Sequence, residues 1–449
     1  MSLSSLLYIG CLIVFVAIYW LIPEKFRTVW ILLASVAFCV YSMPKQMLAL
    51  VLYVLAIYVI GLFAKEGGKL WVAVTVGISV VFLFIYKFEP ISLVAPIGIS
   101  YVTFQCIAYI VDIYRGKMPA EKDVISFFTY NLFFAKLTAG PIERPAEFMA
   151  QLRSPKVLSW KRCSRGVLLI LMGFVKKIAV ADVLGAGVNA VYGAAATSTG
   201  WETILASFMY AVQILFDFSG YTDIARGSAM LMGFELTENF DSPYMAVSFR
   251  DFWRRWHISL STWLRDYVYI PLGGSRVVEW RRCFNIVVTF VVSGLWHGIG
   301  WTFLVWGLLH GLLQAGGILI ENSGKKVRAA LRINDKVYAW FMRVRTFLLV
   351  TFAWVFFRAA SLGDAINILW APFRGMGSLG AAFGTLGLSA GTIILVIAGI
   401  VSTTLISRLL KNPVGRDTVI FICILTVIVV ALVFTTTFGT ASPFIYFDF

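Results

Sequence analysis

The sequence is poor in charge and in histidine, and it lacks the common motifs of soluble enzymes. Only 14% of its 449 residues are charged and 60% are hydrophobic, which excludes an ordinary soluble domain, where the charged share is about 25%. The six cysteines are scattered singly with no CxxC pair, so neither a disulfide framework nor a zinc site is supported. GxxxxGK[ST] and HExxH are missing, and no GxGxxG follows a strand, which argues against a nucleotide-binding loop or a zinc-protease helix.

Apolar runs of about twenty residues recur along the chain, and this is the length that crosses a bilayer. We therefore predict an all-α, polytopic integral membrane protein with about 11–12 transmembrane helices, and we treat residues 1–449 as a single membrane-embedded domain. Residues 124–139 are apolar but short, and Lys136 with Gly140-Pro141 suggests a re-entrant or interfacial helix. The predicted spans are 3–22, 28–43, 46–64, 70–87, 95–114, 166–188, 201–218, 284–299, 301–320, 346–360, 390–407 and 419–437.

The basic residues indicate the orientation of these spans. The first apolar run, Leu3 to Leu21, has no Lys or Arg before it, which is the reverse of a cleavable secretory signal. We expect a retained anchor with the N-terminus outside the cytoplasm. The inside loops then collect nearly all 38 Lys and Arg residues, as the positive-inside rule requires; these loops lie near 23–28, 65–70, 115–165, 219–283, 321–345 and 408–418. The net charge of +15 is thereby explained by membrane topology, and we expect membrane lipid rather than nucleic acid as a partner.

The inside segment 219–283 contains a strongly amphipathic stretch from Phe249 to Tyr267. At helical spacing its aromatic and leucine residues share one face and its arginines share the other. Such a helix is typical of the membrane interface, and Pro271 with Gly273-Gly274 should end it. His257 falls on the border between the two faces.

Only three histidines occur in the chain, His257, His297 and His310. Their separations of 40 and 13 residues match no helical ligand pair, so we expect no metal. His297 lies between two apolar runs, where an ionisable group is costly and suggests function. The glycines at 294, 298 and 300 are expected to leave room for a substrate group beside its ring. His257 is either an interfacial residue without chemistry or part of the site, and His310 is interpreted as structural, with Gln314 one turn on as its partner.

Two acidic residues, Asp217 and Asp266, are further candidates for the functional site. Asp217 lies at the inner end of an apolar run, where it either orients a histidine, binds a polar substrate or pairs with a nearby arginine. Asp266 has the same alternatives, because Arg265 and Arg254 are close in sequence. A transporter is the competing class, but transporters tend to carry matching broken helices in two halves. Here the functional-looking residues crowd between positions 217 and 310, which favours a membrane enzyme.

The motifs around these residues resemble the membrane-bound O-acyltransferase family, and within it the bacterial branch that contains the alginate O-acetylation membrane protein. The longest matching stretch runs from Asp251 through Arg254-Arg255-Trp256-His257 to Pro271-Leu272-Gly273-Gly274. Four further stretches agree: Pro96 to Gln105, Ala139-Gly140-Pro141-Ile142, Phe216-Asp217-Phe218-Ser219-Gly220-Tyr221-Thr222-Asp223 and Leu295-Trp296-His297-Gly298. The resemblance covers the chain from about residue 90 onward.

The resemblance implies a central catalytic channel with His297 as the catalytic histidine and His257 as the second important one. Trp296, Asp217 and Asp266 are expected to support them. It further implies an O-acyltransferase of the bacterial inner membrane that moves an acyl group, expected to be acetyl, from acetyl-coenzyme A or an acylated carrier protein, with no tightly bound cofactor. The acceptor would be an extracytoplasmic polysaccharide such as alginate, or a partner acetyltransferase outside the membrane. D-alanyl transfer to teichoic acid, peptidoglycan O-acetylation and polysaccharide-precursor transport stay open as alternatives.

Overall fold

The computed structural model describes residues 3–87, 96, 98–138, 140–320 and 332–411. Within these ranges nearly all regular structure is helical, and the β pairing is limited to one isolated antiparallel bridge between Phe240 and Trp256. The prediction of an all-α fold is therefore confirmed. The chain divides into two compact units, and each is described by itself.

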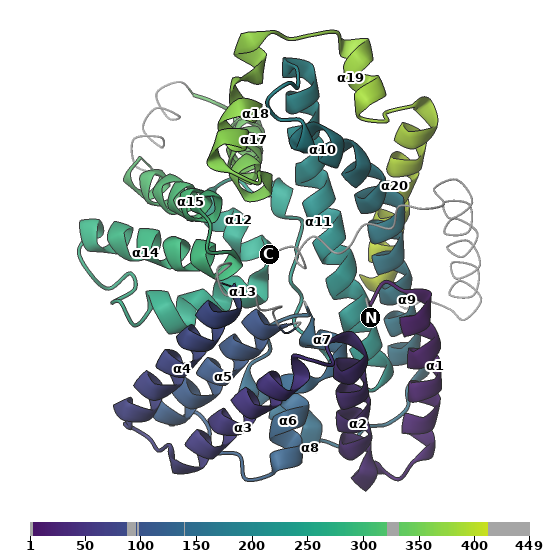
Figure 1. Cartoon of the computed structure of the whole chain (residues 1–449), viewed down its shortest axis with the longest axis vertical. Coiled ribbons are helices and arrows are strands. Elements are labelled where there is room, and N and C mark those ends of the chain that lie inside the picture. Colours follow the sequence, from purple (N-terminus) through teal and green to yellow (C-terminus); the bar gives the residue numbers. More distant parts are fainter. Residues whose placement is uncertain (1–2, 88–95, 97, 139, 321–331, 412–449) are drawn as a thin grey trace. The chain divides into compact units, whose positions relative to one another are not determined.

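The first unit takes in the described residues of Met1–Phe174, Gly220–Thr237 and Ile406–Ile428. Its helices α3, α4 and α5 lie side by side (Figure 1), and the Tyr53 hydroxyl joins α3 to Ser79 of α4 at 2.7 Å. The helices of this unit are α1 (Leu6–Leu21), α2 (Glu24–Ser42), α3 (Met47–Phe63), α4 (Lys69–Lys87), α5 (Ile99–Tyr114), α6 (Val124–Leu132), α7 (Phe134–Leu137), α8 (Pro145–Arg153) and α9 (Trp160–Phe174).

The second unit takes in the described residues of Val175–Ser219, Glu238–Leu405 and Val429–Phe449. Two long helices, α11 (Gly200–Leu231) and α20 (Ala390–Lys411), belong to it except for their C-terminal parts. Its other elements are the π-helix η2 (Val175–Asp182), α10 (Val183–Gly193), the short η3 (Pro243–Met245), α12 (Phe249–Arg255), α13 (Ile258–Leu264), the π-helix η4 (Arg265–Tyr269), α14 (Glu279–His297), α15 (Trp301–Leu319), α17 (Asp335–Arg358), α18 (Leu362–Arg374) and α19 (Leu379–Thr385).

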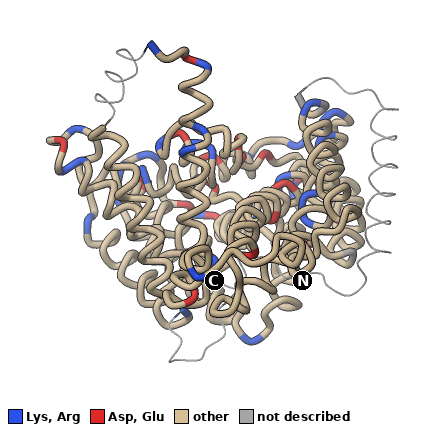
Figure 2. Tube along the Cα trace, turned by 90° about the horizontal axis from the view of Figure 1, so that it is seen from above, with Lys and Arg blue, Asp and Glu red and all other residues tan. Residues whose placement is uncertain are grey.

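Many of the predicted spans correspond to helices long enough for a bilayer. Six described helices are long and apolar enough to cross one, namely α2, α4, α11, α15, α17 and the first part of α20. Three shorter apolar helices, α1, α3 and α5, match three more predicted spans. Long uncharged stretches separate the coloured charged residues along the chain (Figure 2). The predicted span 419–437 lies outside the described residues. The chain is thus a multi-pass membrane protein.

Helix α11 is longer than predicted. The expected span 201–218 continues as helix through Ser219-Gly220 to Leu231, so the predicted inside segment 219–283 begins with a helix instead of a loop. A glycine inside a helix weakens it, but here close packing compensates: a Cβ on Gly173 of α9 would lie 2.4 Å from the Gly220 carbonyl oxygen. The small residues allow α9 and this end of α11 to approach closely.

The predicted re-entrant segment 124–139 forms two short helices, α6 and α7, separated at Phe133. Its lysine is not an interfacial charge. Lys136 is 1% exposed and donates to the Gln105 side-chain oxygen and to the Tyr130 carbonyl. The segment is too short to cross a bilayer, and its lysine is hydrogen-bonded inside the protein.

The amphipathic stretch is not one continuous helix, and this prediction is wrong. It is divided into α12, α13 and η4, with a turn at Trp256-His257. Its aromatic side is buried in the protein core, where Phe249, Phe252, Trp253 and Trp256 belong to one hydrophobic cluster. The apolar residues pack against other helices of the second unit, so the stretch does not present them to a membrane surface.

Candidate functional site

The turn at His257 is built by local hydrogen bonds. Ser248 caps α12 by accepting from the Asp251 amide at 3.1 Å, and α12 then ends at Arg255. Asn239 holds the next residues: its carbonyl oxygen accepts from the Ile258 amide at 3.0 Å and its side-chain oxygen accepts from the Ser259 amide at 3.1 Å. His257, which lies in the turn between α12 and α13, has φ 44° and ψ 55°. A non-glycine residue in this left-handed region is uncommon and is often found at functional sites.

His257 is fully buried against aromatic rings. The ring of Phe218 lies 4.7 Å from it, centroid to centroid, at 81°, and the ring of Trp296 lies at 6.3 Å. Burial lowers the pKa of His257 to about 3, because an apolar surrounding disfavours the charged imidazolium. His257 is therefore neutral at physiological pH and offers one hydrogen-bond donor and one acceptor. Such a group is better suited to positioning a substrate than to removing a proton from it.

His297 is the last residue of α14, and it is also buried. Its ring is surrounded by Trp296 at 4.8 Å, Phe357 at 5.1 Å and Trp306 at 5.2 Å. The three rings come from α14, α17 and α15. They exclude water from the histidine, and in such surroundings electrostatic interactions are stronger than in water.

The glycines around His297 serve a different purpose from the one predicted. A Cβ on Gly294 would lie 2.4 Å from the Phe303 carbonyl oxygen, and one on Gly298 would lie 2.4 Å from the Phe303 ring. These positions are therefore filled by α15, and the expected room for a substrate is not at Gly294 or Gly298. Their physical role is to let α14 and α15, which lie side by side (Figure 1), pack closely. Only at Gly300 is the nearest such contact as long as 3.6 Å.

Trp296 joins the two predicted histidines. Its indole contacts the ring of His297 at 4.8 Å and the ring of His257 at 6.3 Å. The structure thus brings together three of the five predicted site residues, although His257 and His297 are forty positions apart in the chain. These three residues, His257, Trp296 and His297, are called the histidine site below.

Asp217 directly precedes Phe218, the residue whose ring contacts His257. Its carboxylate is buried and ion-paired with Lys177 at 2.6 Å, and Lys177 also pairs with Asp182 at 2.8 Å. Phe218, the next residue on α11, carries the ring that contacts His257. Of the alternatives for Asp217, pairing with a cation is observed, but the cation is a lysine and not the expected arginine.

Asp266 and His310 have other surroundings. Asp266, in η4, pairs with the neighbouring Arg265 at 2.7 Å. His310 is fully buried, and its Nδ1 accepts a hydrogen bond from the Trp253 indole at 3.3 Å. The predicted partner of His310 was Gln314, so this detail is corrected: Trp253 lies in the aromatic core across from α15 and is in reach, although it is distant in sequence.

Three further residues of the site were not predicted. Lys177, Phe218 and Trp306 each contact a predicted residue directly. A signal for Lys177 was present, since it lies within the predicted span 166–188 and an ionisable residue inside a span suggests function. The π-helical conformation of Val175–Asp182 agrees, because π-helices are frequent at functional sites. Phe218 lies within the family-like stretch from Phe216 to Asp223, whereas no sequence signal distinguishes Trp306 from other core aromatics.

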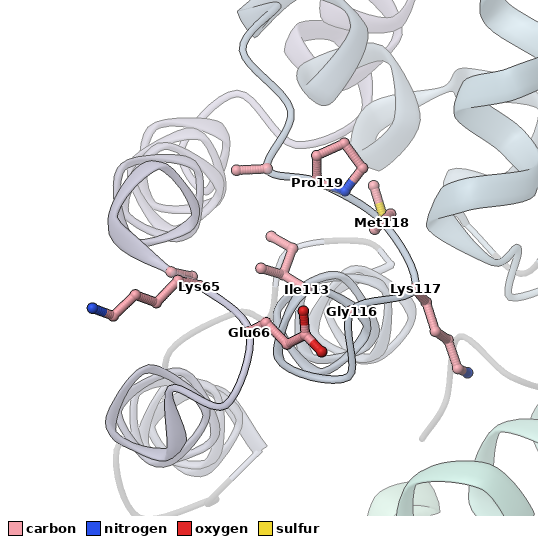
Figure 3. Close-up of a pocket in the computed structure, with 9 residues that line it drawn as sticks. Lys65, Glu66, Ile113, Gly116, Lys117, Met118 and Pro119 are labelled. Carbon is pink, nitrogen blue, oxygen red and sulfur yellow. The ribbon is translucent and has the colours of Figure 1, made fainter.

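A separate pocket opens in the first unit, between the α3–α4 connection and the end of α5 (Figure 3). It has a volume of about 320 Å³ and includes none of the predicted site residues. Lys65 and Lys117 point away from it on opposite sides, while the Glu66 carboxyl lies toward Gly116. Lys117 also pairs with Asp112 at 3.3 Å.

Comparison with known proteins places these residues within a family. The model of "MBOAT, membrane-bound O-acyltransferase family" matches residues 119–357, more than half of the chain, and this region contains the histidine site. The chain is 34% identical to the probable alginate O-acetylase of Pseudomonas aeruginosa, over 85% of this chain and 77% of that protein.

The chain is also similar to proteins that are named for peptidoglycan or teichoic acid as the acceptor. Identity to the peptidoglycan O-acetyltransferase of Helicobacter pylori is 32%, over 77% of this chain and 73% of that protein. Identity to the teichoic acid D-alanyltransferase of Streptococcus thermophilus is 29%, over 73% of this chain and 84% of that protein. The chain belongs to the membrane-bound O-acyltransferase family and is a multi-pass membrane O-acyltransferase.

Proposed function

We propose that this protein moves an acetyl group from a cytoplasmic thioester donor across the bacterial inner membrane for the O-acetylation of an extracytoplasmic polysaccharide similar to alginate. The observation that carries the proposal is the contact of Trp296 with both His257 and His297 inside the family match. The similarity to several probable alginate O-acetylases, each about a third identical over most of this chain, supports the acetyl group and the polysaccharide.

His297 is proposed as the general base. A histidine suits this role because its unperturbed pKa lies near neutrality. The hydroxyl oxygen of the acceptor attacks the thioester carbonyl carbon while His297 takes the hydroxyl proton. The tetrahedral intermediate then collapses, the carbon–sulfur bond breaks, and the proton passes from His297 to the leaving thiolate. The products are an ester and a free thiol.

His257 is proposed to position a reactant. It is neutral because burial lowers its pKa to about 3, so it can hold a hydrogen bond to a carbonyl or hydroxyl group without taking the proton itself. Asp217 supports it indirectly, because the ion pair with Lys177 fixes the part of α11 that carries Phe218. Asp266, near the start of η4, is proposed to lie on the donor side.

The donor is proposed to be acetyl-coenzyme A or an acylated carrier protein. Both are anionic and would be attracted by basic residues. We propose that the arginines that precede and begin α14 face the cytoplasm, because the basic residues of the sequence gather in the loops predicted to lie inside; they are Arg276, Arg281 and Arg282. The N-terminus would then lie outside the cytoplasm.

The test is the transfer of label to an isolated polymer. Cells expressing the wild-type chain are fed labelled acetate or labelled D-alanine, and the cell-surface polysaccharide, peptidoglycan and teichoic acid are isolated separately. The proposal predicts labelled acetate on the polysaccharide, and none in cells with H297A. Label only on peptidoglycan, or labelled D-alanine on teichoic acid, would assign the acceptor of the other relatives instead. Purified chain, donor and polymer then show whether a partner acetyltransferase is needed.

A further inference from the structure

His310 is a buried histidine for which the mechanism above has no use. It is fully buried on α15, and its Nδ1 accepts the hydrogen bond from the Trp253 indole. A neutral imidazole carries one proton, so an accepting Nδ1 places the hydrogen of His310 on Nε2. This Nε2 is buried and has no hydrogen-bond partner among the residues that the structure describes. His310 thus presents an unused N–H donor.

Trp306 presents a second donor of the same kind. It is fully buried one helical turn before His310, and its indole Nε1 also has no hydrogen-bond partner within the described ranges. The two rings are 5.0 Å apart. The Trp306 ring is also 5.2 Å from His297. Two unused donors therefore lie beside each other next to the proposed base.

Such donors are unusual in a protein core. Leaving a buried donor unpaired costs about 1–3 kcal/mol, and each exception in a native structure calls for an explanation. The neighbouring Trp354 stacks on Trp306 at 5.8 Å, and its buried indole Nε1 is likewise without a hydrogen-bond partner among the described residues. Trp306 and His310 are singled out by their position, because the Trp306 ring lies 5.2 Å from the ring of the proposed base His297 and 5.0 Å from the ring of His310.

The chemistry of acyl transfer supplies the acceptor that is needed. When the hydroxyl attacks the thioester, the carbonyl electron pair moves onto oxygen, and this oxygen becomes negatively charged. Preorganised N–H donors in a water-excluded site stabilise that charge and are among the largest contributions to catalysis. A carbonyl oxygen has two lone pairs and can accept from both rings at once.

We propose that the Trp306 Nε1–H and the His310 Nε2–H are the oxyanion donors of this enzyme, which hold the carbonyl oxygen of the acyl group while His297 accepts the hydroxyl proton. This inference rests on the proposed function, because it assigns further catalytic residues to the same transfer. It also explains why His310 is held by Trp253: that hydrogen bond fixes the tautomer whose donor lies on Nε2.

The test compares variants that remove a donor with variants that keep the ring or the donor. W306F removes the indole N–H and keeps a smaller aromatic ring, and H310F removes the imidazole donor. H310Q keeps an amide donor together with an acceptor for Trp253. W354F is the matched control, because it makes the same change at a buried indole of α17 that stacks on Trp306. Each purified protein is checked for an unchanged melting temperature and assayed for acyl transfer from acetyl-coenzyme A at saturating acceptor.

Loss of one oxyanion donor is expected to lower kcat about 100-fold to 1,000-fold. W306F and H310F should show this loss with little change in KM, H310Q should recover a large part of the rate, and W354F should match the wild type. If W306F and H310F turn over at the wild-type rate while H297A is inactive, the oxyanion assignment is wrong and the proposed function stands. If H297A itself retains full transfer, the proposed role of His297 as the base is wrong, whatever the oxyanion variants show.

Discussion

The indole of Trp296 in α14 lies 6.3 Å, centroid to centroid, from the ring of His257 in the turn between α12 and α13. The same indole contacts His297 at 4.8 Å. One side chain therefore lies against both histidines, and we expect the geometry of the site to depend on its shape.

Replacing Trp296 should accordingly reduce transfer without removing either histidine. W296L loses both ring contacts, and a misplacement of about 1 Å in an active site can lower the rate about 100-fold. W296F keeps an aromatic ring and should lose much less. Rates of acyl transfer per folded protein check this. Trp301 is the control, because it follows the same turn but is 71% exposed; if W301L is as damaging as W296L, the effect does not arise at the histidine site.

The stability of the protein should depend on pH through His257. Its pKa is lowered from 6.5 to about 3, so below pH 6.5 the unfolded chain takes up a proton that the folded protein does not. Stability is therefore complete above pH 6.5 and falls as the pH drops toward 3, by about 1.4 kcal/mol for each unit.

The measurement compares unfolding of the detergent-purified wild type and H257N at pH 7.5 and 5.5. Asparagine tolerates the left-handed backbone of this position, so the variant should fold but lack the titrating group. We expect the wild type to lose about 1 kcal/mol more than H257N on acidification. An identical loss in both proteins would show that His257 is not held neutral by burial.

The ion pairs of Lys177 should stabilise the second unit strongly. K177M leaves the buried carboxylates of Asp217 and Asp182 without this cation, and breaking a buried pair in this way typically costs about 3–5 kcal/mol. The double variant K177M/D217N removes one of those charges and should be more stable than K177M alone. Denaturation of the wild type, K177M, D217N and the double variant forms the cycle, with K176M as the control for loss of a neighbouring lysine. Simple additivity of the two substitutions would contradict the pairing.

Close packing at Gly298 gives a further prediction. A methyl group there would meet the Phe303 ring at 2.4 Å, so G298A should force α15 or the end of α14 to move. Overpacking of this kind costs about 1–3 kcal/mol, and the shift should also disturb His297, the preceding residue. The double variant G298A/F303L provides space and should regain stability. A wild-type melting temperature for G298A would mean that the turn adapts without strain.

The sequence was a good guide to the helices, since hydrophobic runs are local, and the two histidines that its motifs single out both contact the Trp296 indole. It was a poor guide where the tertiary structure decides. The break at His257 is held by Asn239 and by the bridge between Phe240 and Trp256, while the apolar periodicity continues through it, so the stretch resembles one helix. The extension of α11 past Ser219 likewise depends on the contact of Gly220 with α9.

The interaction partners of the site residues were equally hard to predict. Asp217 and Lys177 are forty positions apart and meet only because α11 packs against the π-helix. The glycines near His297 suggested an open approach to the ring, but a sequence does not reveal that Phe303 occupies that space. Spacing along one chain segment cannot identify partners that arrive from another helix.

The central claim is that His297 is the base for acyl transfer, and the rate of a single turnover tests it most directly. Purified wild type and H297A are mixed with labelled acetyl-coenzyme A and a polysaccharide acceptor, and the ester formed is followed in time. General-base catalysis contributes about 100-fold to 10,000-fold, so H297A, with an unchanged melting temperature, should be slower by at least the lower factor. Ester formation by H297A at the wild-type rate would contradict the account.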